Sequence, residues 1–234
     1  MKYILWDFDG TLSYRDGNWP ATLHSVLLKN NIIDIPVEKI TPYLRSFSEV
    51  KVFTWDIYEK SHKELLGAKT WWEYYEFHFS NIFQKLGVEE NISIELSKQF
   101  KDEYMDIANW HIYDDVINVL EYLKKDNKNI ILSNHIPELE CIVRGLNIDE
   151  YFMNIFTSAN IGFEKPNPKI YQYVLEKLGI NETDCIIIGD SYRADIKGGL
   201  TMGIKSILVR AENTNNYEHY CKDLKNIIGK IEKM

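Results

Sequence analysis

The stretch that decides the fold is YILWDFDGTL, residues 3–12, in which an apolar run leads directly into two acidic residues. An apolar run that ends near a glycine predicts a buried β-strand, and side-chain alternation places Asp7 and Asp9 on one side with Phe8 turned away. In an open α/β sheet, ligands bind at the carboxyl ends of the strands. Two carboxylates at that edge repel each other unless a cation or a shared proton relieves them. The stretch therefore predicts a site where one acid attacks and the other transfers protons, with a metal controlling the charge.

A calcium loop is the alternative interpretation of an Asp-x-Asp-Gly sequence. An EF-hand loop needs a third oxygen ligand soon after the glycine and a glutamate at its end. Here Gly10 is followed by Thr11 and Leu12, and an apolar strand precedes the acids. The sequence excludes the EF-hand interpretation.

Composition narrows the class of protein. The 234 residues are 45% apolar and 26% charged, which is typical of a globular protein with one core and room for a small second domain. The net charge of −8, with no basic stripe, argues against a nucleic-acid polymer as partner. No apolar run reaches membrane-spanning length and no leader is recognisable, so we expect no membrane partner. The cysteines Cys141, Cys185 and Cys221 lack metal-ligand spacing, and we expect them to be reduced, buried thiols of a cytoplasmic protein.

Apolar periodicity predicts a helical block followed by alternating strands and helices. The helices expected in the block are 20–31, 37–47, 54–67, 70–86 and 93–107. The strands expected after it are 129–133, 154–157, 185–189 and 206–209, with helices at 115–125, 138–145, 168–178, 194–201 and 217–229. This alternation predicts an α/β fold with a parallel sheet covered on both faces. We assign the sheet domain to 1–14 and 109–234, with 15–108 inserted after the first strand.

Three later segments add polar groups at strand ends. Ser133 and Asn134 end one strand and could bind an anion. Lys165 lies in a proline-stiffened turn before a helix, and Asp190 ends another strand, with Asp195 about one helical turn later. Each feature alone has an ordinary structural explanation, but together they supply what phosphoryl transfer requires. Hard oxygen ligands without histidine or cysteine select Mg²⁺ over zinc.

These motifs resemble those of the haloacid dehalogenase-like hydrolase superfamily. The first motif matches residues 7–12, the second matches Ser133, and the third matches Lys165 with the proline that follows it. The fourth matches Asp190 and Asp195 in a Gly-Asp-(four residues)-Asp frame. Order, spacing and the helical insertion all agree, so the resemblance covers the whole chain. It implies a Rossmann-like core and an α-helical cap over the site.

The resemblance also implies chemical roles for the acids. Asp7 is expected to be the nucleophile that forms an aspartyl-phosphate, and Asp9 the general acid and then the base that activates water. Mg²⁺ is expected to bind the Asp7 carboxylate, the Asp9 carbonyl and Asp190, with Asp195 orienting that arrangement.

The phosphoryl group is expected to lie between a hydroxyl, backbone amides and a cation. Ser133 and the backbone of Asn134 would hold its oxygens. Lys165 would offset the negative charge of the nucleophile and the phosphate.

These roles predict a magnesium-dependent phosphatase acting on a small phosphorylated metabolite. Dehalogenases generally lack an acid at the position of Asp9, so phosphate-ester hydrolysis is favoured. A phosphosugar mutase is the alternative enzyme, because it uses the same pair of acids. A phospho-aspartate switch, resembling response-regulator receivers, is the alternative from another class. The oligomeric state is left open.

The insertion is where substrate selection is expected to lie. The aromatic stretch 71–79 either forms a stacking wall for a flat leaving group or fills the core of the cap, and we favour the core. Trp19 and Arg15 are near the expected hinge and could close over the site. His135 is expected on the loop surface.

Overall fold

The computed structural model describes residues 1–45, 62–213 and 216–234. Its centre is a six-stranded parallel sheet in the order β5-β4-β1-β6-β7-β8. The strands are β1 (Tyr3–Trp6), β4 (Lys128–Ser133), β5 (Phe152–Thr157), β6 (Cys185–Gly189), β7 (Lys205–Val209) and β8 (Tyr220–Cys221). The predicted parallel α/β sheet is confirmed, and β1 lies in its middle.

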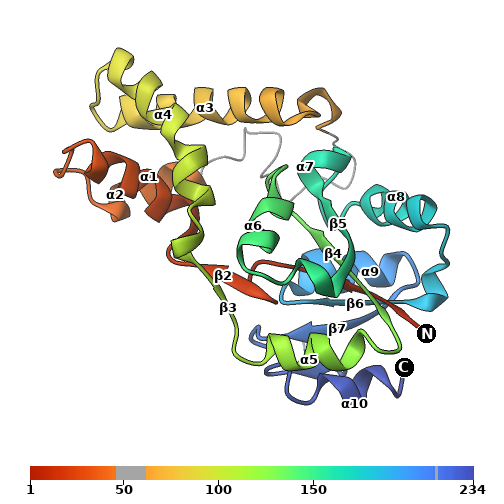
Figure 1. Ribbon diagram of the computed structural model, residues 1–234. Helices are drawn as coiled ribbons and strands as arrows, with labels where there is room; N and C mark the ends of the chain where they lie inside the picture. Colours follow the sequence, from red (N-terminus) through yellow and green to blue (C-terminus); the bar gives the residue numbers. More distant parts are fainter. Residues whose placement is uncertain (46–61, 214–215) are drawn as a thin grey trace.

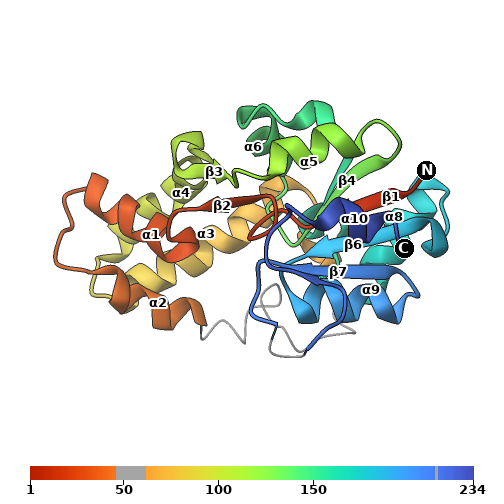
Figure 2. The ribbon, with the colours of Figure 1, turned by 90° about the horizontal axis from the view of Figure 1, so that it is seen from below.

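Alternate side chains of the central strands enter two separate apolar layers. Ile4 and Trp6 of β1 belong to the layer shared with α5 (Val116–Leu123), α6 (Leu139–Gly145) and α10 (Ile227–Ile231). Leu5 belongs to the opposite layer, under α8 (Pro168–Leu178). Figure 2 shows α5 and α6 on one side of the sheet and α9 (Gly198–Thr201) on the other. Because helices cover both faces, β1 is apolar at successive positions rather than alternating with polar residues.

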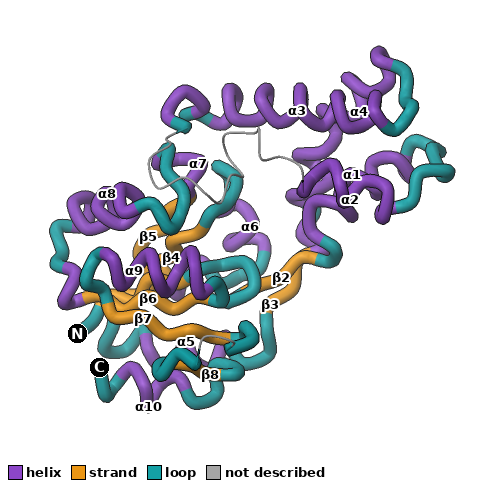
Figure 3. The backbone as a smooth tube through the Cα atoms, turned by 180° about the vertical axis from the view of Figure 1, so that it is seen from behind, coloured by secondary structure: helices purple, strands orange, loops and turns teal. Residues whose placement is uncertain are grey.

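The helical block extends beyond the carboxyl ends of β1 and β4 (Figure 1). It comprises α1 (Asn18–Lys29), α2 (Val37–Arg45), α3 (Ala68–Lys85) and α4 (Glu90–Met105). Its connection to the sheet is the antiparallel pair β2 (Ser13–Arg15) and β3 (Trp110–Ile112), which Figure 3 shows from behind. The segment predicted as helix 54–67 lies outside the described residues as far as residue 61, and Lys63–Leu65 forms one 3-10 turn. A short helix, α7 (Ser158–Ile161), follows β5 and faces α3.

Three expectations from the sequence are wrong in detail. The predicted helix 217–229 is instead β8 followed by α10, because residues 220–221 pair with the edge of β7 and satisfy its backbone groups. The predicted helix 194–201 divides into a π-helical turn over Tyr192–Lys197 and then α9. Cys141 is exposed, whereas Cys185 and Cys221 are buried as expected. In the parts of the chain that the structure describes, no helix is both long and apolar enough to cross a bilayer.

Candidate active site

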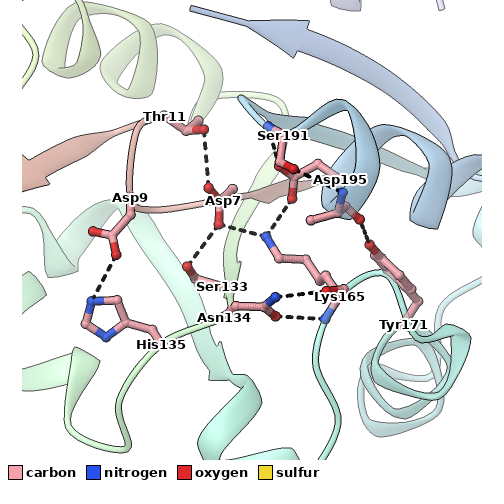
Figure 4. A network of polar contacts seen from close by, with 11 residues as sticks. Asp7, Asp9, Thr11, Ser133, Asn134, His135, Lys165, Tyr171, Ser191 and Asp195 are labelled. Carbon is pink, nitrogen blue, oxygen red and sulfur yellow. Dashed lines mark hydrogen bonds and ion pairs between the residues drawn. The ribbon is translucent and has the colours of Figure 1, made fainter. Parts of the chain in front are cut away.

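Asp7 lies at the carboxyl end of β1, where the central strands of the sheet converge (Figure 4). Its amide donates to the Ile188 carbonyl at 2.9 Å, which continues the pairing with β6 and fixes the backbone. The chain then turns through Gly10, whose φ of +78° is a conformation that favours glycine. A Cβ at Gly10 would lie 2.3 Å from Oδ2 of Asp190. The glycine therefore allows the Asp190 carboxylate to approach the turn that follows Asp7.

The Asp7 carboxylate is held by three side chains. Its Oδ1 accepts from Ser133 Oγ at 2.9 Å and from Lys165 Nζ at 2.7 Å. Its Oδ2 has one long contact, 3.5 Å from Thr11 Oγ1, at the outer limit of a hydrogen bond. Asp7 is 8% exposed. The contacts leave Oδ2 as the less constrained oxygen. Thr11 is a site residue that the sequence motifs did not predict, although its position four residues after Asp7 was a usable signal.

Lys165 is a buried cation between two carboxylates. Its Nζ contacts Asp195 Oδ1 at 2.6 Å as well as Asp7, and the residue is 4% exposed. Burial alone would lower the pKa of Lys165, but the charges and hydrogen bonds of Asp195 and Asp7 raise it above its ordinary value. The ammonium therefore stays charged at neutral pH.

The side chain of Asn134 positions Lys165. Its Oδ1 accepts from the Lys165 amide at 2.7 Å, and its Nδ2 donates to the Lys165 carbonyl at 2.9 Å. Two bonds in opposite directions hold the backbone of the lysine against the end of β4. We expect the Asn134 backbone to bind phosphate, but this use of its side chain could not be predicted from the sequence, because Asn134 and Lys165 are 31 positions apart.

Asp7, Asp190 and Asp195 form an acidic cluster in which one oxygen from each lies within 4.8 Å of the others. Burial, followed by the charges of Asp7 and Asp195, raises the pKa of Asp190 to about 8. Burial also raises the pKa of Asp195 to about 6, with Lys165 opposing the rise. Such mutual destabilisation of carboxylates is relieved by a divalent cation, and the all-oxygen donor set fits Mg²⁺.

Within this cluster, Asp195 accepts hydrogen bonds of ordinary length at both of its oxygens. Its Oδ1 accepts from Lys165, and its Oδ2 accepts from the Ser191 amide at 3.0 Å. It is 1% exposed. Because both oxygens already accept from protein donors, Asp195 is better suited to orienting the lysine than to holding an ion alone.

The Asp9 side chain points away from the acidic cluster, toward His135 (Figure 4). Asp9 Oδ2 lies 3.6 Å from His135 Nε2. Burial, and next the charge of Asp7, raises the pKa of Asp9 to about 8. Because 33% of the side chain is accessible, water moderates this rise and a substrate oxygen can reach the carboxyl group. Asp9 is therefore placed to hold a proton beside Asp7 at neutral pH.

His135 is buried, so its predicted place on the loop surface is wrong. Its ring contacts those of Phe8, Tyr104 and Trp110, with centroids 5.6–6.0 Å apart. Burial lowers the pKa of His135 to about 3, so the imidazole is neutral. The ring is drawn inward because aromatic residues of α4 and β3 cover the end of β4, which is a tertiary effect.

A cavity of about 110 Å³ opens beside Asp9, between the helical block and the sheet domain. It is lined by Asp9, Trp19, Trp71, Tyr75, Tyr104, Asn134, His135, Ile136, Ser158 and Glu164. Trp71, Trp72, Tyr75 and Phe79 of the aromatic stretch 71–79 pack in the core of the helical block as expected, whereas Phe77 is 64% exposed. The rings of Trp71 and Tyr75 lie 4.1 Å apart. The same two rings also line the cavity. Trp19 lines it as well.

Arg15 does not line this cavity. Its guanidinium donates to the carbonyls of Glu103 and Tyr104, at 3.0 and 3.3 Å, and so attaches β2 to the end of α4. The expectation that Arg15 closes over the site is replaced by an anchoring contact at the junction of the helical block.

Comparison with known proteins identifies the family. A family model described as haloacid dehalogenase-like hydrolase matches residues 1–203. The haloacid dehalogenase-like hydrolase domain-containing protein 3 of Mus musculus is 27% identical over 146 residues, which are 62% of this chain and 57% of that protein. The glyceraldehyde 3-phosphate phosphatase of Methanothermobacter thermautotrophicus is 34% identical over 86 residues, 36% of this chain and 38% of that protein. The matched part of the chain thus spans about two fifths to three fifths of these curated relatives.

Solved structures show the same fold over nearly the whole chain. The HAD-hydrolase YfnB of Bacillus subtilis, solved bound to magnesium, superimposes with a TM-score of 0.71 at 20% identity. The superposition covers 99% of this chain and 98% of that one. The family match over residues 1–203 and this shared fold lead to one conclusion: the chain belongs to the haloacid dehalogenase-like hydrolase family.

Proposed function

We propose that this protein is a magnesium-dependent phosphatase that hydrolyses a small phosphorylated metabolite. The observation that carries the proposal is the pair of donors, Ser133 and Lys165, on one oxygen of Asp7 beside the Asp190 and Asp195 carboxylates. We also propose that 1–14 and 109–234 form the catalytic core and that 15–108 form a cap. The relative named as a glyceraldehyde 3-phosphate phosphatase supports an activity on phosphate monoesters.

The chemistry begins at the Asp7 carboxylate. An oxygen of Asp7 attacks phosphorus, the bond to the leaving oxygen breaks, and Asp9 gives that oxygen its proton. Asp9, now a carboxylate, removes a proton from water, which attacks the aspartyl-phosphate and releases phosphate while restoring Asp7. Holding a proton on Asp9 before the first step requires the raised pKa described above.

Ser133 and Lys165 stabilise the charge that moves during transfer. Lys165 is already held beside Asp7, so its charge needs no rearrangement when the phosphoryl oxygens arrive. Asp195 and Asn134 maintain its position from two sides.

The acidic cluster offers carboxylate oxygens, which are ligands that Mg²⁺ prefers. Asp7 and Asp190 would hold it, together with the Asp9 carbonyl, and Asp195 would orient the arrangement. When bound, the ion neutralises the carboxylates and the phosphoryl oxygens, which lets the two anions approach each other.

Release of p-nitrophenol and phosphate from p-nitrophenyl phosphate in the presence of Mg²⁺ tests the proposal. We expect steady turnover by the native protein and none by Asp7→Asn, which has nearly the same shape. The exposed Asp149 gives a matched control, Asp149→Asn, which we expect to keep full activity. Isomerisation of a sugar phosphate without net phosphate release would favour a mutase. A stable phosphoprotein without turnover would favour a switch.

A further inference from the structure

The cavity beside Asp9 is where the leaving group of the substrate would lie. Its lining includes Asp9, which is the proposed acid for the leaving oxygen, and Asn134, whose backbone is expected to bind the phosphoryl group. Its remaining walls come from the helical block, from the loop that carries Glu164, and from His135, Ile136 and Ser158 of the sheet domain. A phosphate monoester bound at Asp7 with its ester oxygen near Asp9 would place its alcohol part in this cavity.

The cavity offers no positive charge to an anionic alcohol part. Two acids, Asp9 and Glu164, line it, and none of its described lining residues is a lysine or an arginine. His135 supplies no positive charge, because burial lowers the pKa of its imidazole to about 3. A carboxylate or second phosphate entering here would lose hydration and meet no cation.

Glu164 is an acid without a polar partner on the protein. Its side chain makes no hydrogen bond or ion pair with any residue that the structure describes. Burial raises the pKa of Glu164 to about 8, and its charge acts on the nearby Tyr75 hydroxyl. The adjacent residue, Lys165, has its backbone held at both amide and carbonyl by Asn134. Glu164 therefore directly precedes a backbone segment that Asn134 holds in place. Burial of its carboxyl group without a polar partner lowers the stability of the folded protein.

Aromatic rings form the wall on the cap side. Trp19 lies 5.1 Å from Tyr75 and 5.7 Å from Tyr104, and Tyr75 lies 4.1 Å from Trp71, measured between centroids. The faces of such rings carry negative potential and attract cations. A flat neutral ligand would stack on the rings but would make no use of the acid.

We infer that this pocket selects phosphate monoesters whose alcohol part carries an organic ammonium group, held between Glu164 and the aromatic rings. The inference rests on the proposed phosphatase function and names its substrate class. An ammonium group uses both features, because the rings attract its charge and because that charge favours the carboxylate form of Glu164, which then pairs with it. The small volume of the cavity favours an amino alcohol over a larger substituent.

Matched substrates test the inference. Phosphocholine and phosphoethanolamine supply a quaternary and a primary ammonium. The 3,3-dimethylbutyl ester of phosphate has the shape of phosphocholine without the charge, and phosphoglycolate is anionic. We expect kcat/KM for at least one cationic ester to exceed that of the neutral and the anionic ester by about tenfold or more. Comparison of the two cationic esters shows whether the pocket prefers a quaternary or a primary ammonium group. Equal or better use of the neutral or anionic ester would overturn the inference.

Substitution of Glu164 tests the assigned partner. Glu164→Gln keeps the size of the side chain and removes its ability to ionise. We expect it to lower the ratio of kcat/KM for the cationic ester to that for its neutral counterpart by about tenfold. Glu182→Gln, at an exposed acid of the sheet domain, should leave this ratio unchanged. An unaltered ratio in Glu164→Gln would overturn the assignment.

Binding of the free alcohols separates this inference from the proposed function. Choline, ethanolamine and 3,3-dimethylbutanol are each added to the native protein while its tryptophan fluorescence is measured, since Trp19 and Trp71 line the pocket. Binding of choline or ethanolamine that is tighter than that of 3,3-dimethylbutanol, and that is weakened in Glu164→Gln, would support the cation site. Absence of p-nitrophenyl phosphate hydrolysis alongside that binding would refute the phosphatase proposal alone. Turnover of p-nitrophenyl phosphate with no preference for either cation would refute the inference and leave the phosphatase proposal standing.

Discussion

Lys165 Nζ donates to Oδ1 of Asp7 at 2.7 Å, although the two residues are 158 positions apart in the sequence. The same ammonium lies 2.6 Å from Asp195, so one cation compensates two buried carboxylates. Removal of either member of a buried ion pair leaves a charge without compensation. The contact therefore links the folding stability of the protein to its proposed chemistry.

Lys165→Met tests that link, because it keeps the length of the side chain and removes its charge. We expect kcat to fall by about 10²-fold or more and the free energy of unfolding to fall by about 3–5 kcal/mol at pH 8. The loss should be smaller at pH 5, where the carboxyl groups can take up a proton. Urea unfolding at the two pH values measures this. Lys177→Met, at an exposed lysine of α8, is the control, and an equal loss in both variants would contradict the buried pairing.

Addition of Mg²⁺ should raise the melting temperature, because an ion that binds the folded acidic cluster shifts the unfolding equilibrium. Asp190→Asn should reduce this rise, whereas Asp149→Asn, at an exposed acid, should retain it. Beryllofluoride added with Mg²⁺ should raise the melting temperature further in the native protein and not in Asp7→Asn. A rise of equal size in Asp190→Asn would refute the assigned metal site.

The sequence was sufficient where the determining interactions are local. Apolar runs that end in acidic residues predicted β1 and β6, and pairing of these neighbouring strands brings Asp7 and Asp190 together. Contacts across the chain were not predictable in this way. The inward turn of His135 depends on aromatic residues from other elements, and the side-chain bonds of Asn134 depend on a loop 31 residues away. The strand β8 was missed because a two-residue strand has no periodicity of its own.

The pKa of Glu164 predicts how stability depends on pH. Burial raises it from 4.5 to about 8 in the folded protein, so between these values the folded state holds a proton that the unfolded state has lost. The contribution of Glu164 to stability is therefore present below about pH 4.5 and decreases as the pH rises toward 8. Glu164→Gln lacks this proton. The melting temperature of the variant minus that of the native protein should increase from pH 5 to pH 8.5.

Each 1 kcal/mol of this effect should appear as about 2–4 °C in a chain of this size. Other titrating groups are common to both proteins, so the difference isolates Glu164. Glu182→Gln should show no such trend, because its carboxyl group is exposed. A difference that is constant with pH would contradict the burial of an uncompensated acid.

Glu138 joins the helical block to the sheet domain. At the start of α6 it accepts from Trp72 Nε1 of α3 at 2.9 Å and pairs with Lys101 of α4. Hydrogen bonds to charged groups contribute about 1.5–3 kcal/mol. A double-mutant cycle with Trp72→Phe and Glu138→Gln should therefore give a coupling energy of about 1 kcal/mol or more in urea unfolding.

The same two substitutions should also change kcat and KM together, because a contact between the two parts of the chain affects how they close around substrate. Glu140→Gln is the matched control on the same helix. Its carboxylate is exposed and pairs with Arg144 within α6, so it should cost about 0.5 kcal/mol or less and leave both constants unchanged. If the cycle gives no coupling while Glu140→Gln behaves as expected, the bond between Trp72 and Glu138 does not hold the two parts together.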